Sequence, residues 1–78
     1  MHNAKLALLA HLAEVTDASA AEVAVALKRP LPATGMALLR LVRSGLVNRS
    51  WDPRRRTYFY AITPRGQARV NYFSSRRS

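Results

Sequence analysis

The 78-residue sequence contains no cysteine, which excludes both a disulfide framework and a thiolate metal site. Its two histidines, His2 and His11, do not have the i, i+4 spacing of a helical metal-binding pair. We therefore expect no metal ion and no other cofactor. A chain this short buries only a modest core, so association of subunits is its remaining source of additional buried area.

Acidic residues are scarce, since four Asp and Glu stand against thirteen Lys and Arg and the formal net charge is +9. The distribution is uneven along the chain. Residues 1–22 hold one Lys and three acids, a net charge of −2. Residues 23–78 hold twelve basic residues and a single acid, Asp52, a net charge of +11. Such an excess over so short a segment predicts a polyanionic partner.

Long hydrophobic runs are absent as well, and no apolar stretch approaches the ~18 residues that a membrane-spanning helix needs. The N-terminal segment shows no small-residue cleavage site that leads into a mature domain, so the cytoplasm is the expected location. No carboxylate pair, Ser-His-Asp set or phosphate-cradling loop is placed for catalysis, and the sequence does not predict an enzyme. Repeats and internal linkers are missing too, so residues 1–78 are expected to form one domain.

The first expected helix covers residues 4–15, which are rich in Ala and Leu and contain neither Gly nor Pro. Apolar residues surround most of its circumference, so this helix needs two packing partners. The expected core-facing residues are Leu8, Leu12 and Val15, and the expected outward-facing residues are Leu6, Ala10 and Ala13. We expect a homodimer that uses this helix, the C-terminal helix near Val70 and Phe73, or both.

Two further helices are expected before residue 46. Ser19 and Glu22 match a capping box, which predicts the start of a second helix that continues to about Leu27. Prolines then interrupt the pattern, and a third helix is expected over residues 32–44 with Gly45 just beyond its end. The expected core face of the third helix consists of Thr34, Leu38 and Leu41. Two short helices joined by a tight break indicate a helix-turn-helix.

After residue 45 the pattern of apolar residues changes from one typical of helices to one typical of strands. Residues 46–51 and 57–62 are rich in β-branched and aromatic side chains, which predicts two strands. Residues 52–56, Asp-Pro-Arg-Arg-Arg, predict the turn of a hairpin, because Asp and Pro favour a type I turn. Thr63 and Pro64 supply the N-cap and first residue of a closing helix. Side chains alternate between the two faces of a strand, and those of Tyr58, Tyr60 and Ile62 in the second strand are expected to point inward.

The predicted fold is mainly α with a small β-hairpin, in the order helix, helix, helix, strand, strand, helix. Four pieces of sequence occur in this order: Leu38 with Leu41, Gly45-Leu46-Val47 with Arg49, Asp52-Pro53-Arg54-Arg55-Arg56, and Ile62-Thr63-Pro64-Arg65-Gly66. With these pieces, residues 27–66 resemble the winged helix-turn-helix regulators of the MarR and PadR type. In those families the second piece begins the first wing strand, the third forms the wing, and the fourth leads into the last helix. Full-length MarR relatives are longer and dimerise through extended terminal helices.

The resemblance and the charge together imply a transcription regulator, with repression as the expected output, that binds double-stranded DNA with full or partial sequence specificity and associates with the nucleoid. The third helix is expected in the major groove, with Arg40 on a guanine edge or phosphate and Arg43 beside it. Three adjacent arginines at the hairpin tip repel one another in water, whereas phosphates or a narrow minor groove would stabilise them. The expected DNA-contacting residues are Lys28, Arg29, Thr34, Arg40, Arg43, Arg49, Arg54, Arg55 and Arg56.

Two other functions stay open at this stage. The third helix is unusually apolar, which favours a protein-interaction module that docks on polymerase or another regulator; the residues concerned are Pro32, Ala33, Gly35, Met36 and Leu39. The second alternative is a small RNA-binding domain in which hairpin aromatics stack on unpaired bases. Those aromatics are Trp51, Tyr58, Phe59 and Tyr60, and the expected arrangement instead has them covering the helical core.

Overall fold

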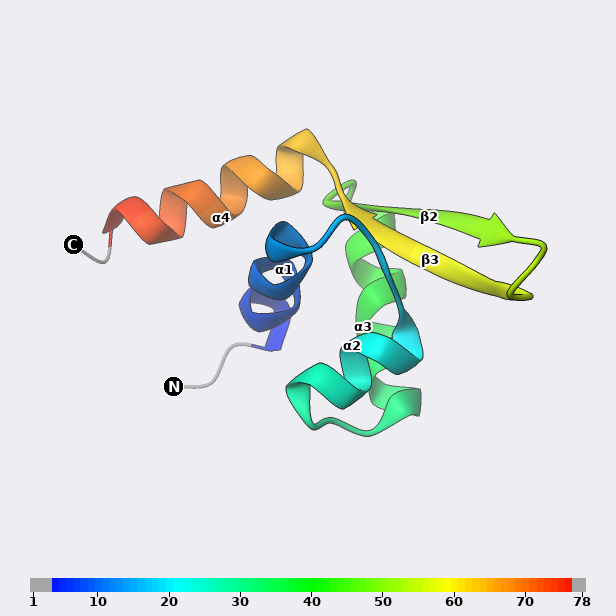
Figure 1. Ribbon diagram of the computed structural model, residues 1–78. Coiled ribbons are helices and arrows are strands. Elements are labelled where there is room, and N and C mark those ends of the chain that lie inside the picture. Colours follow the sequence, from blue (N-terminus) through cyan, green and yellow to red (C-terminus); the bar gives the residue numbers. More distant parts are fainter. Residues whose placement is uncertain (1–3, 77–78) are drawn as a thin grey trace.

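The computed structural model describes residues 4–76, the side chain of Arg76 excepted, so His2 lies outside the described residues. The elements follow the order α1 (Ala4–Glu14), β1 (Ala18–Ser19), α2 (Ala20–Leu27), α3 (Leu31–Arg43), β2 (Val47–Asp52), β3 (Thr57–Ile62) and α4 (Pro64–Arg76). Figure 1 shows α1, α2 and α3 gathered at the base of the β2–β3 hairpin, with α4 leaving on one side and the hairpin projecting on the other. The predicted mainly α fold with a hairpin is confirmed.

Local interactions define the ends of α2 and α3. The Ser19 hydroxyl accepts a hydrogen bond from the Glu22 N–H (3.2 Å), and the Glu22 carboxylate accepts one from the Ser19 N–H (2.9 Å). This is the predicted capping box, which satisfies two donors that the start of a helix leaves without partners. The third helix begins at Leu31, one residue earlier than predicted, after Pro30 as N-cap. Gly45 follows its end with a φ of 76°, a left-handed conformation that glycine adopts at little cost.

The sheet has three antiparallel strands in the order β1-β3-β2, one more than predicted. In the hairpin, Val47 pairs with Ile62 and Asp52 pairs with Thr57. The additional strand is two residues long, and its Ala18 pairs with Tyr60. Two residues are too few to show an alternating pattern, so the sequence did not predict this strand. It joins the connection between α1 and α2 to the middle of the sheet.

Asp52 organises the turn at the hairpin tip. Its carboxylate accepts hydrogen bonds from the backbone N–H groups of Arg54 (2.9 Å) and Arg55 (3.3 Å). Its carbonyl oxygen accepts one from the N–H of Arg56 (2.8 Å), which has a left-handed φ of 55°. Short polar side chains such as Asp stabilise turns in this way. The single acid of the basic segment therefore has a structural role in presenting the three arginines.

Thr63 connects the hairpin, α3 and α4. Its hydroxyl accepts a hydrogen bond from the Gly66 N–H (3.0 Å), which confirms it as the N-cap of α4. The same hydroxyl donates to the carbonyl oxygen of Gly45 (2.8 Å), and the Thr63 N–H donates to that of Leu46 (3.1 Å). The two bonds to Gly45 and Leu46 hold the start of α4 against the segment between α3 and β2.

The core lies where α1, α2 and α3 meet the base of the sheet, and its members include Leu8, Leu9, Leu12, Val23, Leu38, Leu41, Leu46, Val47 and Tyr60. The predicted burial of Val15 and of Tyr58 is wrong. Val15 is exposed, because α1 ends at Glu14 and Val15 is no longer on its inner face. Tyr58 is 39% exposed although it shares a sheet face with buried Tyr60, and Phe59 on the opposite face is buried instead. The hairpin extends beyond the helices, so the inner face of its outer half has no core beneath it.

Candidate nucleic-acid interface

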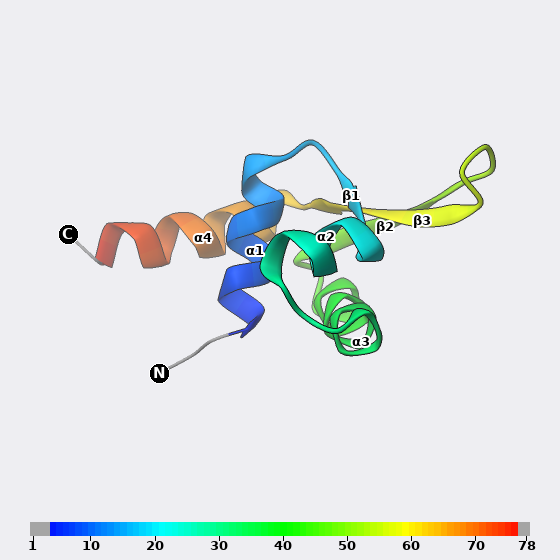
Figure 2. The same cartoon turned by 60° about the horizontal axis from the view of Figure 1, so that its bottom comes forward.

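The face of α3 opposite its buried Thr34, Leu38 and Leu41 is exposed. Figure 2 looks almost along the axis of α3 and shows it at the edge of the molecule, with the hairpin reaching past it. The exposed side chains on this face and along its margin are Pro32, Ala33, Met36, Arg40 and Arg43, and Leu39 on the same face is half-buried. The face is apolar over its first half and basic over its second half.

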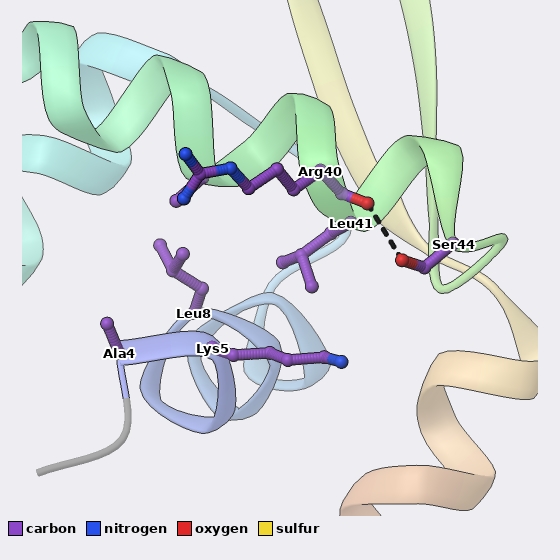
Figure 3. Close-up of a pocket in the computed structure, with 7 residues that line it drawn as sticks. Ala4, Lys5, Leu8, Arg40, Leu41 and Ser44 are labelled. Atoms are coloured by element: carbon purple, nitrogen blue, oxygen red, sulfur yellow. Dashed lines mark hydrogen bonds between the residues drawn. The ribbon is translucent and has the colours of Figure 1, made fainter.

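Arg40 lies on the side of this face nearest α1. It lines a hollow of about 300 Å³ between α1 and α3, together with Lys5, Leu8 and Ser44 among others. Figure 3 shows its side chain extending back along α3 toward the earlier turns, above Leu8. In the part of the chain that the structure describes, neither Arg40 nor Arg43 has a carboxylate within ion-pair distance. Both charges are therefore available to an anionic partner.

Thr34 is not placed for DNA contact. It is 2% exposed, and its hydroxyl donates a hydrogen bond to the Pro30 carbonyl oxygen (2.8 Å) at the start of the same helix. The expected core role of this residue is met, and a contact with a base edge is incompatible with its burial. We remove Thr34 from the candidate interface, so the first half of α3 presents no polar side chain at its exposed face.

Lys28 and Arg29 lie in the break between α2 and α3, as expected. Lys28 is the C-cap of α2 in a left-handed conformation, and it is exposed. Arg29 is half-buried and lines a second hollow of about 240 Å³, to which Ala33 and Arg40 also contribute. The structure thus brings Arg29 and Arg40 to the same side of α3, although they are far apart in the sequence.

The arginines of the hairpin tip differ in their surroundings, although all three are exposed. The Arg55 side chain lies 3.8 Å from the Asp52 carboxylate, and its guanidinium lies 4.8 Å from the centre of the Phe59 ring. Arg54 and Arg56 flank it at the tip of the wing formed by β2 and β3 (Figure 1). This places Arg54 and Arg56 as the least constrained cations of the tip.

A cluster of Arg49, Trp51 and Tyr58 covers the inner face of the outer half of the wing. The Trp51 and Tyr58 rings meet edge to face at 5.0 Å, and the Arg49 guanidinium lies 4.0 Å from the centre of the Tyr58 ring. Trp51 and Tyr58 are both exposed, which the expectation of core packing missed. The available signal was their distance from the base of the hairpin, since a strand face beyond the core has no apolar partner. Arg49, in the middle of β2, is therefore engaged with Tyr58.

The outward face expected for α1 is partly occupied. Leu6 is half-buried and shares a small hollow of about 130 Å³ with Leu9, Arg69 and Phe73, so it packs toward α4. The expectation that Leu6 faces outward is therefore wrong. Among residues 4–76, no helix is long and apolar enough to span a bilayer, and no three His, Asp or Glu side chains gather as metal ligands.

Comparison with known proteins finds similarity in structure alone. No protein-family model and no curated protein matches the sequence. The structure of the S. aureus MepR–DNA complex matches with 26% identity over 96% of this chain and 63% of the other, at a TM-score of 0.87. BpsR of Bordetella bronchiseptica is a protein whose binding to DNA is regulated by 6-hydroxynicotinic acid. It matches with 25% identity over 96% of this chain and 54% of its own, at a TM-score of 0.86.

Wild-type MarR from E. coli gives a similar result, with 25% identity over 92% of this chain and 54% of its own, at a TM-score of 0.84. The chain thus spans somewhat more than half of the length of each of these proteins. The matched part includes nearly all of the present chain, so the similarity extends over its helices and its wing together.

Proposed function

We propose that this chain, which has the winged helix-turn-helix fold of MarR-family transcription regulators, binds duplex DNA and regulates transcription without catalysing a reaction. In this proposal α3 enters the major groove, and the wing tip contacts the flanking backbone or minor groove. Repression by covering a promoter is the output, and the protein acts in the cytoplasm on the nucleoid. The structural neighbours are transcription regulators, and one of them was determined in complex with DNA.

The uncompensated charge of α3 and the wing is the observation on which this proposal rests. Arg40 and Arg43 extend from α3, while Arg54 and Arg56 extend from the wing, which projects sideways from the end of that helix (Figure 1). The one acid of residues 23–78, Asp52, is occupied by the turn between the strands. Positive charge that no carboxylate offsets is stabilised against phosphates, where each contact releases condensed counterions.

Phosphate contacts and base contacts have separate roles in such an interface. Phosphate contacts orient the protein and carry no sequence information, whereas contacts to base edges in the grooves distinguish sequences. In this proposal, phosphates are contacted by Lys28 and Arg29 before the start of α3 and by the wing-tip arginines. We assign Arg40 and Arg43 to base edges or the adjoining phosphates, because they lie on the exposed face of the helix that we propose for the groove.

Fluorescence anisotropy with a labelled 24-base-pair duplex of arbitrary sequence tests this function. We expect binding at low salt. The logarithm of the affinity should fall linearly with the logarithm of the salt concentration, with a slope of about −0.9 for each phosphate contact. Unlabelled duplex should compete better than single-stranded RNA of the same length. No binding at low salt would exclude a DNA-binding role, and stronger competition by the RNA would favour an RNA-binding domain.

A protein-interaction module is the second candidate, because apolar side chains are exposed on α2 and α3. Val25 is 79% exposed and Met36 is 55% exposed, and Leu31 is exposed as well. Exposed apolar patches frequently mark sites of protein contact. This candidate would be supported if the protein does not bind duplex DNA at low salt but is retained by immobilised RNA polymerase.

A further inference from the structure

We propose that α3 recognises thymine through its 5-methyl group, with Ala33 and Met36 as the contacting side chains. This inference rests on the proposed binding of duplex DNA and specifies what the recognition helix would read. It follows from the chemistry of the exposed face of α3, which differs between the first and second halves of the helix.

The first half of α3 offers no side chain that could hydrogen-bond to a base edge. Its sequence from Leu31 to Ala37 is Leu-Pro-Ala-Thr-Gly-Met-Ala. The single polar side chain, Thr34, is buried and uses its hydroxyl on the Pro30 carbonyl oxygen. In helix-turn-helix proteins, the N-terminal residues of the recognition helix are those that contact base edges. Here that position presents hydrocarbon and a thioether, with Ala33 and Met36 both exposed.

Thymine is the base that matches such a surface. In the major groove it presents the O4 acceptor and a C5 methyl group, and contact of apolar side chains with that methyl group is a recognised mode of reading. A guanine or unmodified cytosine edge presents polar groups instead, and an apolar contact leaves those groups without partners at a free-energy cost. Ala33 is short enough to bring the helix close, and the flexible Met36 side chain adapts to the methyl position.

Flanking charge indicates that a nucleic-acid duplex, more than an apolar protein surface, covers this patch. Met36, Arg40 and Arg43 follow one another at intervals of four and three residues, so the cations lie on the same face as the apolar patch. The Arg40 side chain extends back along the helix (Figure 3) and lines a hollow to which Ala33 also contributes. A thymine-containing major groove supplies both partners at once, methyl groups for the patch and phosphates or guanine edges for the arginines.

The decisive comparison removes the methyl groups and nothing else. Four 24-base-pair duplexes would be measured: an A·T-rich sequence, the same sequence with every thymine replaced by deoxyuridine, a G·C-rich sequence, and the same with 5-methylcytosine. We expect deoxyuridine to weaken binding by about fourfold for each methyl group that is buried. We expect 5-methylcytosine to strengthen binding, because its methyl group occupies the corresponding position in the groove.

Variants assign the effect to α3. Met36→Ala keeps a good helix former at an exposed position, and it should reduce the ratio of thymine to deoxyuridine affinity. Val25→Ala, a truncation of a more exposed apolar side chain on α2, is the matched control and should keep the wild-type ratio. Equal affinity for thymine and deoxyuridine duplexes would overturn the inference and leave duplex binding intact. An unchanged ratio in Met36→Ala would overturn the assignment to this helix, and failure to bind any duplex would exclude the proposed function itself.

Discussion

Gly66 occupies the most crowded backbone position among the glycines of this domain. A Cβ atom there would run into the carbonyl oxygen of Leu46 and the side chain of Ile62. The crowding arises where Thr63 holds the start of α4 against the segment that follows α3. Gly35 is the opposite case, since a Cβ at that position would meet nothing within 4 Å. One glycine is required by packing, and the other costs helix stability without a steric reason.

The two glycines therefore respond in opposite directions to the same substitution. Gly66→Ala should lower the free energy of unfolding by about 1–3 kcal/mol, because backbone atoms must move to accept the methyl group. Gly35→Ala should raise it by about 0.5–1 kcal/mol, since alanine loses less conformational entropy in a helix interior. Urea denaturation followed by circular dichroism measures both. A stabilised Gly66→Ala variant would mean that the contact between α4 and Leu46 is looser than the structure shows.

At the scale of the element, the tip of the wing is stabilised by hydrogen bonds within its own turn. The Asp52 carboxylate and carbonyl oxygen satisfy three N–H groups of the turn, so the arginine side chains are not needed to close it. Arg55 contacts Asp52 and Phe59, whereas no such contact within residues 4–76 is seen for Arg54 or Arg56. Charge at these two positions can therefore be removed without disturbing the hairpin.

Neutralising the wing should weaken DNA binding independently of sequence. Arg54→Gln with Arg56→Gln should lower affinity for all duplexes alike, because phosphates carry no sequence information. The slope of log affinity against log salt should become shallower by about 0.9 for each phosphate that the wing no longer neutralises. The matched control is Arg65→Gln with Arg69→Gln on α4, which removes the same charge away from the proposed interface. Equally weakened binding in the two double variants would show that net charge acts alone and that the wing makes no specific contact.

At the scale of the whole molecule, α4 is the candidate surface for the expected homodimer. Leu6 of α1 packs toward α4, and Val70 is packed against the core. Tyr72, in contrast, is 54% exposed and meets the Phe73 ring edge to face at 5.4 Å. The last turn of α4 lies apart from the other helices in both views (Figures 1 and 2). Of the two surfaces that the sequence suggested for a homodimer, α4 is the one that the structure favours.

We expect the chain to form a dimer through α4, which sedimentation equilibrium at increasing concentration would detect. Tyr72→Glu places a charge in that interface and should yield a folded monomer with much weaker DNA binding, whereas Tyr72→Phe should remain dimeric. A two-fold dimer places two recognition helices about one helical turn apart, so the preferred site should be an inverted repeat. A wild-type chain that stays monomeric at high concentration would exclude this arrangement.

The features that the sequence determined by itself depend on neighbouring residues. The capping box of Ser19 and Glu22, the left-handed Gly45 and the N-cap at Thr63 all act within a few positions of the chain, so their signals survive without knowledge of the fold. The hairpin, its arginine tip and the basic character of residues 23–78 are visible for the same reason. Most of the element order, and the positions of the exposed arginines, followed from such local signals.

Other features of the protein were decided only by the tertiary structure, because they depend on which helices and strands contact one another. Strand β1 exists because its two residues reach the free edge of β3. Tyr58 is exposed because the helices support only the base of the wing, and alternation along a strand does not show where that support ends. Leu6 packs toward α4 through contacts between two distant helices, which no local pattern encodes. Burial is a property of the packed molecule, and a sequence pattern predicts which side chains share a face but not what covers that face.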